Sequence, residues 1–326
     1  MSQSLYRHLK QQNPAREIDV LAPDWCRAVL SRMPEVSSAI AMPVGHGSLQ
    51  WKVRKELGKR LSTQGYEQAL VLPNSLKSAL IPWFAGIPTR TGWRGEMRYG
   101  LLNDIRPLDK QAFPLMVQRY VGLSQKAGSP APELKDILPP QLHIDHEAQR
   151  EALEQFNLDA EGAIAFCPGA EFGPAKRWPD YHYAALAKLL IADGKKVWLF
   201  GSEKDKPACE LIRSQLSAEE QKHCINLAGI TSLTQAIDLI AACDAAVSND
   251  SGLMHIAAAV NTPLIALYGP TSPGFTPPLS DQATIIRLIE GFHKIRKGDA
   301  EQGYHQSLID ITPEMAYNAL QARMTP

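Results

Sequence analysis

Short apolar segments with the length of β-strands alternate with segments of helical periodicity along nearly the whole chain. Most of the apolar segments end in a polar or glycine-containing turn, and the connections to the helical segments are short. This alternation favours parallel β-α-β winding, because a crossover helix brings the chain back to the same end of the sheet before the next strand begins. The predicted fold class is therefore α/β. We expect strands within residues 18–23, 37–43, 66–75, 89–93, 163–169, 196–202, 225–229, 244–250 and 263–269.

The length of the chain, 326 residues, exceeds what one hydrophobic core usually supports, which predicts two domains of roughly 150 residues each. The composition changes over residues 124–145, where four prolines occur together with glycine and serine, so this segment is the predicted linker. We expect two Rossmann-like β/α/β domains, over residues 1–156 and 157–326. The tail, ITPEMAYNALQARM, is expected to form a final helix.

Charge is balanced over the chain but not between its halves. Lysine plus arginine and aspartate plus glutamate both number 34, which argues against general nucleic-acid binding. Residues 1–156 hold 20 basic against 15 acidic side chains, a net charge of +5, and the remainder carries −5. The basic half indicates an anionic partner.

Neither a membrane span nor a secretory signal is predicted. No apolar run approaches the ~20 residues of a membrane-spanning helix, and the first 20 residues lack an apolar core followed by small residues. A cytoplasmic location is expected. The five cysteines are scattered, without a C-x-x-C pair, and are predicted to be buried thiols.

The stretch VSNDSGLMH places a polar turn between a predicted strand and a predicted helix. Ligands of open parallel sheets bind beyond the carboxyl ends of the strands, and the free N–H groups of a helix start favour anions. Asp250, Ser251 and Gly252 are therefore candidates for holding a diphosphate, with His255 close by on the helix. The alternative is that Asn249, Asp250 or Ser251 only caps the helix.

A second strand end, in CPGAEFGPAKRWP, supplies positive charge. Either Lys176 or Arg177 can neutralise a phosphate leaving group, and the alternative is a solvated pair of charges. Neither this loop nor any other contains G-x-G-x-x-G or G-x-x-x-x-G-K-[ST], which disfavours a dinucleotide oxidoreductase or a P-loop NTPase.

The first half has two polar segments of its own. PNSLKSA contains Lys77 and Ser78 at a strand end, and RTGWRGEMRYG spaces Arg90, Arg94 and Arg98 four residues apart. Arginine suits carboxylates and phosphates, and the interleaved aromatic residues suit sugar faces or lipid headgroups. A plain surface loop would produce the same pattern.

In VSNDSGLMHIAAAVNTPLIALYGPTSP, CPGAEFGPAKRWP, RTGWRGEMRYGLLND and GYHQSLIDITP, the chain resembles the bacterial ADP-heptose:lipopolysaccharide heptosyltransferases of glycosyltransferase family 9. Within that family it is most similar to the members that add the second heptose of the inner core. The resemblance covers essentially the whole chain. It implies a glycosyltransferase B fold, with two Rossmann-like domains facing across a cleft and a terminal helix that crosses back to the first domain.

The resemblance also implies the reaction and the partners. L-glycero-D-manno-heptose would pass with inversion from ADP-heptose to the first heptose of a lipid-anchored lipopolysaccharide core. The enzyme would lie peripherally at the cytoplasmic face of the inner membrane. No metal or other cofactor is expected, since the chain has no D-x-D at a strand end and no His/Cys cluster.

Site residues follow from matching positions. The signature D-[ST]-G-L-x-H, which surrounds the diphosphate and sugar of the donor, matches Asp250, Ser251, Gly252, Leu253 and His255. Lys176 matches the phosphate-binding lysine of the family. Glu203 and Thr231 match loops that reach the adenosine. The acceptor half contains Lys77, Ser78, Arg90 and Arg94.

One expected part has no counterpart. Members of the family open with a strand and a Gly-Asp turn whose aspartate is the general base, whereas this sequence starts within the helix that follows. We expect Met1 to be an internal methionine of a longer protein. A substitute base would be Asp104. The alternatives are a donor-binding but inactive fragment, or a glycosyltransferase of different acceptor specificity.

Overall fold

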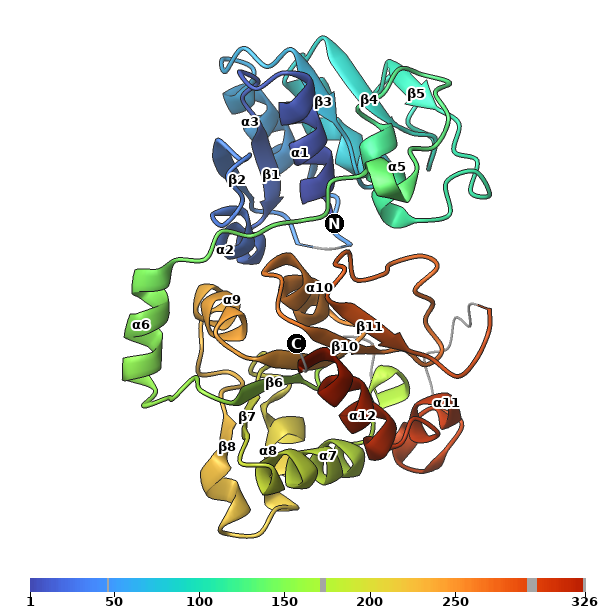
Figure 1. Cartoon of the computed structure of the whole chain (residues 1–326). Helices are drawn as coiled ribbons and strands as arrows, with labels where there is room; N and C mark the ends of the chain where they lie inside the picture. The colour runs from blue at the N-terminus through green and yellow to red at the C-terminus, as the bar shows by residue number, and fades with distance from the viewer. Residues whose placement is uncertain (46, 171–173, 292–297, 325–326) are drawn as a thin grey trace. The chain divides into compact units, whose positions relative to one another are not determined.

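The computed structural model describes residues 1–45, 47–170, 174–291 and 298–324 (Figure 1). The chain forms two compact units, Met1–Pro140 and Gln141–Pro326. The division falls within the linker expected over 124–145, and not at residue 156. The reason is helix α6 (His146–Gln155), whose N-terminal residues bind Asp238 of the second unit: the backbone N–H of Asp145 donates to its Oδ1 at 3.1 Å, and the Gln149 amide to its carbonyl at 2.6 Å.

Among its described residues, the first unit contains five parallel strands in two sheets. One sheet pairs β1 with β2, and the other has the order β3-β4-β5. The strands are β1 (Asp19–Pro23), β2 (Ser38–Met42), β3 (Gln68–Leu70), β4 (Thr89–Trp93) and β5 (Asp104–Arg106). The helices are α1 (Gln3–Gln12), α2 (Arg27–Leu30), α3 (Trp51–Leu61), α4 (Leu80–Phe84) and α5 (Met116–Gly122).

One apolar cluster joins the two sheets of this unit. Its buried members come from α3, α4 and the segment behind α4, and β1, β2 and β3 pack against them. The same two helices therefore cover both sheets. The cluster contains Leu57, Leu61, Ile81, Ala85 and Ile87, with Leu21, Ile40, Met42, Tyr66 and Ala69 packed on it.

The second unit is a doubly wound α/β domain. The part of it that the structure describes has six strands, all parallel, in the order β11-β10-β9-β6-β7-β8. The strands are β6 (Ala163–Cys167), β7 (Lys196–Leu199), β8 (Cys224–Asn226), β9 (Ala245–Asn249), β10 (Leu264–Leu267) and β11 (Ala283–Ile286). The further helices are α7 (Asp180–Ala192), α8 (Lys206–Ser214), α9 (Leu233–Ala241), α10 (Gly252–Ala259), α11 (Gln306–Ile309) and α12 (Pro313–Met324).

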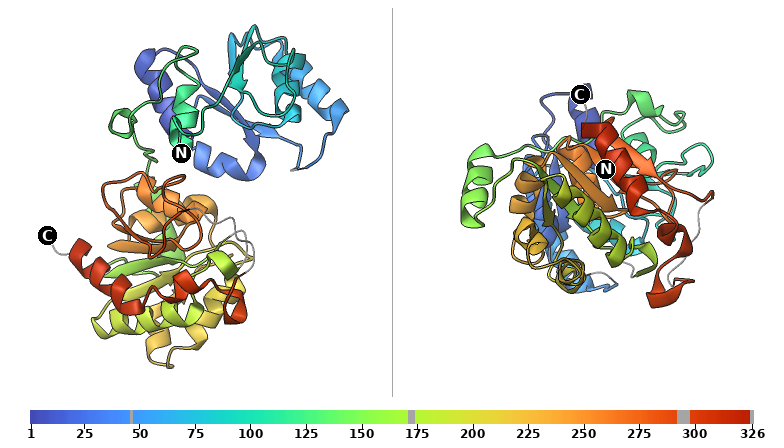
Figure 2. Two further views of the ribbon diagram at one scale, coloured as in Figure 1. Left: turned by 90° about the vertical axis from the view of Figure 1, so that its right-hand side faces the viewer. Right: turned by 60° about the horizontal axis from the view of Figure 1, so that its bottom comes forward.

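The winding reverses between β6 and β9, the two neighbouring central strands. Each is completely buried along its length, as expected for strands covered by helices on both faces. α7 and α12 lie side by side on one face of the sheet (Figure 2). Ala316 and Leu320 of α12 belong to the core of the second unit. The crossing of the terminal helix to the first domain stays a prediction.

The predicted α/β class and the parallel winding are thus confirmed. Four of the five cysteines are buried, as predicted, whereas Cys26 is half-buried. No helix among the described residues is both long enough and apolar enough to cross a membrane.

Candidate functional site

The loops that follow β6 and β9 lie next to each other, because these strands are neighbours on either side of the reversal. In doubly wound folds this is the position where ligands bind. Lys176 lies in the first loop, and Asp250, Ser251 and Gly252 lie in the second.

The side chain of Asn249, the last residue of β9, joins the two loops. Its Oδ1 atom accepts hydrogen bonds from the backbone N–H of Trp178 at 3.0 Å and from the hydroxyl of Tyr183 at 3.2 Å. Its Nδ2 atom donates to the carbonyl of Pro168 at 2.7 Å. Asn249 is fully buried, and each of these three partners is a protein group. It therefore holds the loop that carries Lys176 against the end of β9, a role that differs from the capping considered from the sequence.

The start of α10 is open. Ser251 occupies the N-cap position in an extended conformation, but its side chain makes no capping hydrogen bond. Its Oγ lies 3.3 Å from the hydroxyl of Ser248, which lies 2.8 Å from the Asn249 carbonyl. A Cβ atom placed on Gly252 would meet no described atom within 4 Å. The first N–H groups of the helix thus face space that an anion can occupy.

Lys176 lies close to Asp250. Lys176 is half-buried at the end of a short 3₁₀ helix, Pro174–Lys176. Burial raises the pKa of the Asp250 carboxyl, and the hydroxyl of Thr271 and the charge of Lys176 act in the opposite direction. The loop after β10 therefore contributes Thr271, which sequence reasoning missed. Asp250 thus has a hydrogen bond with Thr271 and lies within range of the charge of Lys176.

Arg177, the second candidate cation, has different surroundings. It lines a cavity of about 250 Å³ together with Pro207, Leu211 and Tyr304. Its charge lowers the pKa of Tyr304, against the larger effect of burial. Arg177 therefore lies beside a different part of the second unit from the start of α10, and the choice of Lys176 for the phosphate stays a prediction.

Glu203 and Thr231 come from the loops after β7 and β8, and these loops touch. The backbone N–H of Gly229 donates to the carbonyl of Gly201 at 3.0 Å. A Cβ atom on Gly229 would lie 2.1 Å from Oε2 of Glu203, and the φ of Gly229 is +74°, so only glycine fits there. The hydroxyl of Thr231 donates to the carbonyl of Leu227 at 3.2 Å. The exposed Glu203 thus lies across the start of the loop that leads to Thr231.

Leu253 and His255 lie in the first turns of α10, where the signature predicted them. Both are half-buried. The stretch CPGAEFGPAKRWP is described except for residues 171–173.

The acceptor candidates of the first unit divide into two kinds. Arg90 donates from Nε to the carbonyl of Leu101 at 2.7 Å and from Nη1 to the carbonyl of Ile87 at 2.5 Å. The Ser78 hydroxyl donates to the carbonyl of Ser75 at 2.5 Å. These are contacts that hold turns. Arg94, by contrast, is exposed, and Lys77 is half-buried.

Arg98, the third arginine of the series, is 1% exposed and has a structural role. Its Nη1 atom donates to the carbonyl of Pro73 at 2.6 Å, and its Nη2 atom donates to the carbonyl of Trp93. Arg98 therefore fastens the segment 94–100 to the turn after β3.

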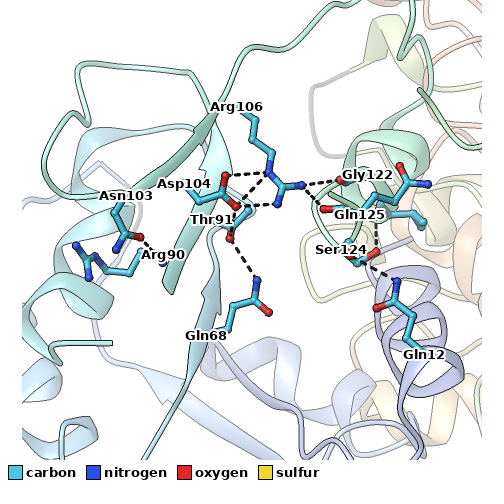
Figure 3. A network of polar contacts seen from close by, with 11 residues as sticks. Gln12, Gln68, Arg90, Thr91, Asn103, Asp104, Arg106, Gly122, Ser124 and Gln125 are labelled. Atoms are coloured by element: carbon cyan, nitrogen blue, oxygen red, sulfur yellow. Dashed lines mark hydrogen bonds and ion pairs between the residues drawn. The ribbon is translucent and has the colours of Figure 1, made fainter. Parts of the chain in front are cut away.

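Asp104, the substitute base, is held in a polar network (Figure 3). Arg106 donates to its Oδ2 at 2.7 Å and the hydroxyl of Thr91 donates to the same atom at 2.9 Å. Arg106 also donates to the carbonyls of Gly122 and Gln125 at 3.1 and 2.7 Å. The hydrogen bond from Arg106 holds the pKa of Asp104 below its usual value. Asp104 thus joins β4, β5 and the end of α5, and it is poorly suited to accept a proton.

The chain is similar to known proteins over nearly its whole length. Residues 54–305 match the model of Glycosyltransferase family 9 (heptosyltransferase). The chain is 60% identical over 326 residues to lipopolysaccharide heptosyltransferase 2 of Escherichia coli (strain K12), covering 99% of this chain and 94% of the relative. It is 59% identical over 327 residues to lipooligosaccharide heptosyltransferase 2 of Haemophilus influenzae, covering 98% and 94%.

A solved structure is also similar to this chain over nearly its whole length. The structure of the E. coli ADP-heptose LPS heptosyltransferase II matches with a TM-score of 0.88 and 56% identity, over 99% of this chain and 94% of that one. The match extends through both units, so it includes the loops after β6 and β9 as well as the first unit. The chain therefore belongs to glycosyltransferase family 9, the heptosyltransferases.

Proposed function

We propose that the chain transfers heptose from ADP-heptose to the first heptose of the lipopolysaccharide inner core, with inversion at the anomeric carbon. It is a glycosyltransferase of lipopolysaccharide core biosynthesis. The observation that carries the donor side of the proposal is the open start of α10 beside Lys176. A diphosphate needs both hydrogen-bond donors and a nearby positive charge, and the two loops supply them together.

The donor diphosphate would bind at the start of α10. The backbone N–H groups at Ser251 and Gly252 would donate to phosphate oxygens, and the ammonium of Lys176 would face the same group. When the bond between the anomeric carbon and the phosphate oxygen breaks, negative charge grows on the departing ADP. Fixed donors already directed at that position stabilise the charge without reorganising.

Asp250 would keep Lys176 in place. Its half-buried carboxyl has a hydrogen bond with Thr271 and is affected by the charge of Lys176. Glu203 and Thr231, at the ends of the adjacent β7 and β8, would bind the adenosine. Leu253 and His255 would line the sugar side of the site. These roles follow from the family signature and from the loops in which the residues lie.

The acceptor hydroxyl must lose a proton to a base while it attacks the anomeric carbon. Asp104 is a poor base for this step, because Arg106 and the Thr91 hydroxyl already donate to its carboxyl. Arg94 and Lys77 would bind acidic groups of the acceptor core. Since that acceptor is anchored in lipid, the enzyme would work peripherally at the cytoplasmic face of the inner membrane.

Transfer of labelled heptose from ADP-heptose tests the proposal. Core acceptors carrying no heptose and one heptose should be compared, with UDP- and GDP-sugars as competing donors. We expect transfer only to the mono-heptosylated core and competition only from adenine nucleotides. Transfer to the heptose-free core would show a different acceptor specificity. ADP binding without transfer to either core would show that this chain is an inactive donor binder.

A further inference from the structure

The first unit carries a cluster of aromatic side chains at its surface. Trp51 at the start of α3 and Trp83 in α4 are 47% and 41% exposed, although both are large and apolar. The ring of Phe84 lies between them, with centroids 5.1 Å from Trp51 and 4.9 Å from Trp83. The two exposed tryptophans and the half-buried Phe84 between them thus form one continuous aromatic cluster across two helices, which is unusual for a surface that contacts only water.

Glycine brings the two helices together. A Cβ atom on Gly58 of α3 would lie 2.4 Å from the Cβ of Phe84 and 2.9 Å from the carbonyl oxygen of Ile81. Only the absence of a side chain at Gly58 allows α4 to approach this closely. The aromatic surface is therefore a fixed feature of the packing of α3 against α4.

Lysines lie beside Trp51 on the exposed side of α3. The inner side of α3 buries Arg54, Leu57, Gly58 and Leu61. Its outer side exposes Lys52, Lys55 and Lys59, with Arg60 and a single acid, Glu56. Trp51, Lys55 and Lys59 are four residues apart and so lie in one row along the helix. Among the residues that the structure describes, no ion pair involves any of these three lysines. We call Trp51, Trp83, Phe84, Lys52, Lys55 and Lys59 the α3–α4 face.

The α3–α4 face is connected to the predicted acceptor loop through Arg54. From the buried side of α3, Arg54 donates from Nε to the carbonyl of Leu49 at 2.6 Å and from Nη2 to that of Ser48 at 3.2 Å. Its Nη1 atom donates to the carbonyl of Lys77 at 3.1 Å. A partner that binds the outer side of α3 would therefore also fix the position of the turn that contains Lys77.

We propose that the α3–α4 face binds the surface of an anionic lipid bilayer. Exposed tryptophans beside unpaired lysines match such a surface, since indole rings favour the headgroup layer and lysines favour anionic headgroups. Each lysine near an anionic membrane strengthens binding by about fivefold, so three of them give about 100-fold. The inference rests on the proposed function in one respect: a lipid-anchored acceptor would meet Lys77 at the membrane.

The experiment measures cosedimentation of the full chain with vesicles. Neutral phosphatidylcholine vesicles and vesicles with a quarter of phosphatidylglycerol are compared at low and high salt. We expect binding to the anionic vesicles at low salt, and loss of that binding at high salt. Lys52→Gln, Lys55→Gln and Lys59→Gln combined should weaken it by about 100-fold, and Trp51→Ala should weaken it at low salt.

A matched control removes three other exposed lysines of the same unit, with Lys110→Gln, Lys126→Gln and Lys135→Gln. We expect it to retain binding within about threefold, since these lysines lie outside the face. Equal losses in the two triple variants, or no binding of the parent chain to anionic vesicles, would overturn the proposal. Light scattering gives a further test. If the parent chain is a dimer and the Lys52/Lys55/Lys59 triple variant is a monomer, the α3–α4 face joins two copies of the chain and the proposal is wrong.

Transfer to a delipidated, water-soluble core separates this inference from the proposed function. The variants of the α3–α4 face should transfer heptose to that acceptor as fast as the parent chain does. If the parent chain transfers heptose but does not bind anionic vesicles, the membrane inference alone is wrong. If the parent chain binds the vesicles but does not transfer heptose, the proposed function alone is wrong.

Discussion

The Oδ1 atom of Asn249 accepts a hydrogen bond of 3.0 Å from the backbone N–H of Trp178, which lies 71 residues earlier in the chain. The same side chain donates to Pro168 at 2.7 Å. Both partners belong to the loop that carries Lys176, and all of these groups are buried. The position of the proposed phosphate-binding lysine therefore depends on one amide at the end of β9.

We expect Asn249→Ala to lower the free energy of unfolding by about 2–4 kcal/mol, because it leaves buried partners without hydrogen bonds. ADP affinity should fall as well, since the loop of Lys176 loses its attachment. Chemical unfolding and calorimetric titration with ADP measure the two effects. Asn249→Asp, which keeps the acceptor and loses the donor, should fall between the parent and the alanine variant. An alanine variant with parental stability would show that the loop is held by other contacts.

Lys176→Ala is expected to reduce the rate of heptose transfer by about 10²–10³-fold, as is usual when one group that stabilises transition-state charge is removed. Its melting temperature should stay close to that of the parent chain, because Lys176 lies at the edge of the core. Lys204→Ala is the control, since Lys204 is an exposed lysine of the loop after β7. If Lys176→Ala loses stability and rate in the same proportion, the lysine has a structural role and the proposed contact with phosphate is wrong.

Gly252→Ala separates binding from folding. The space around Gly252 admits a methyl group, so the free energy of unfolding should change by no more than about 0.5 kcal/mol. ADP affinity should nevertheless fall by at least about tenfold, or roughly 1.4 kcal/mol, because the methyl group would occupy the approach to the N–H groups of α10. Equilibrium binding of ADP measures this.

Gly269→Ala provides the opposite case. A Cβ atom there would lie 2.5 Å from Cγ of the buried Leu308, which should cost about 1–3 kcal/mol of stability. ADP affinity measured on the folded fraction of Gly269→Ala should change little.

For Gly252→Ala, an ADP affinity equal to that of the parent chain would show that the start of α10 is not the phosphate site.

The sequence predicted the winding of the second unit well, because its central strands are short apolar runs that end in polar turns. It did not predict β5 or β11. β5 (Asp104–Arg106) is mostly polar, and its pairing depends on the contact of Asp104 with Thr91 of β4. β11 is a half-exposed edge strand, and no further strand follows it among the described residues. Strands of this kind can be identified from the strands they pair with, but not from their own amino-acid composition.

The sequence identified Asn249 and the three arginines as polar residues of loops, but it did not show which groups their side chains contact. Sequence spacing placed Asn249 in the right turn but suggested a helix cap, since its partners at Pro168 and Trp178 are distant in the chain. The spacing of Arg90, Arg94 and Arg98 suggested a binding surface. Two of the three donate to backbone carbonyls of turns, and periodicity alone cannot distinguish those from arginines that await a ligand.

This difference between the arginines can be measured. Arg94→Ala should raise the KM for the core acceptor by about fivefold or more, the effect of one charge-assisted hydrogen bond, and should leave melting temperature and ADP affinity unchanged. Arg90→Ala should instead lower the free energy of unfolding by about 1–3 kcal/mol, because the carbonyls of Ile87 and Leu101 lose a donor. An acceptor KM that does not respond to Arg94→Ala would exclude this arginine from the acceptor site.

Asp104 should stabilise the first unit in a pH-dependent way. Arg106 and Thr91 lower its pKa in the folded state, so its contribution to stability is present above the unfolded pKa of about 4. That contribution is lost as the pH falls through the lower folded value. Asp104→Asn should therefore cost about 1–2 kcal/mol near pH 7, and this difference from the parent chain should shrink below pH ~4.

Urea unfolding of both proteins at pH 7 and pH 3 tests the sign of this effect. The transfer assay of the same variant then tests the role of Asp104 as a base. A stabilising carboxylate predicts a variant that is less stable at neutral pH but still transfers heptose at a rate within about threefold of the parent wherever both are folded. A general base predicts loss of about 10²-fold or more in rate. Because Arg106 already donates to the oxygen that would have to accept the proton, we expect the first outcome.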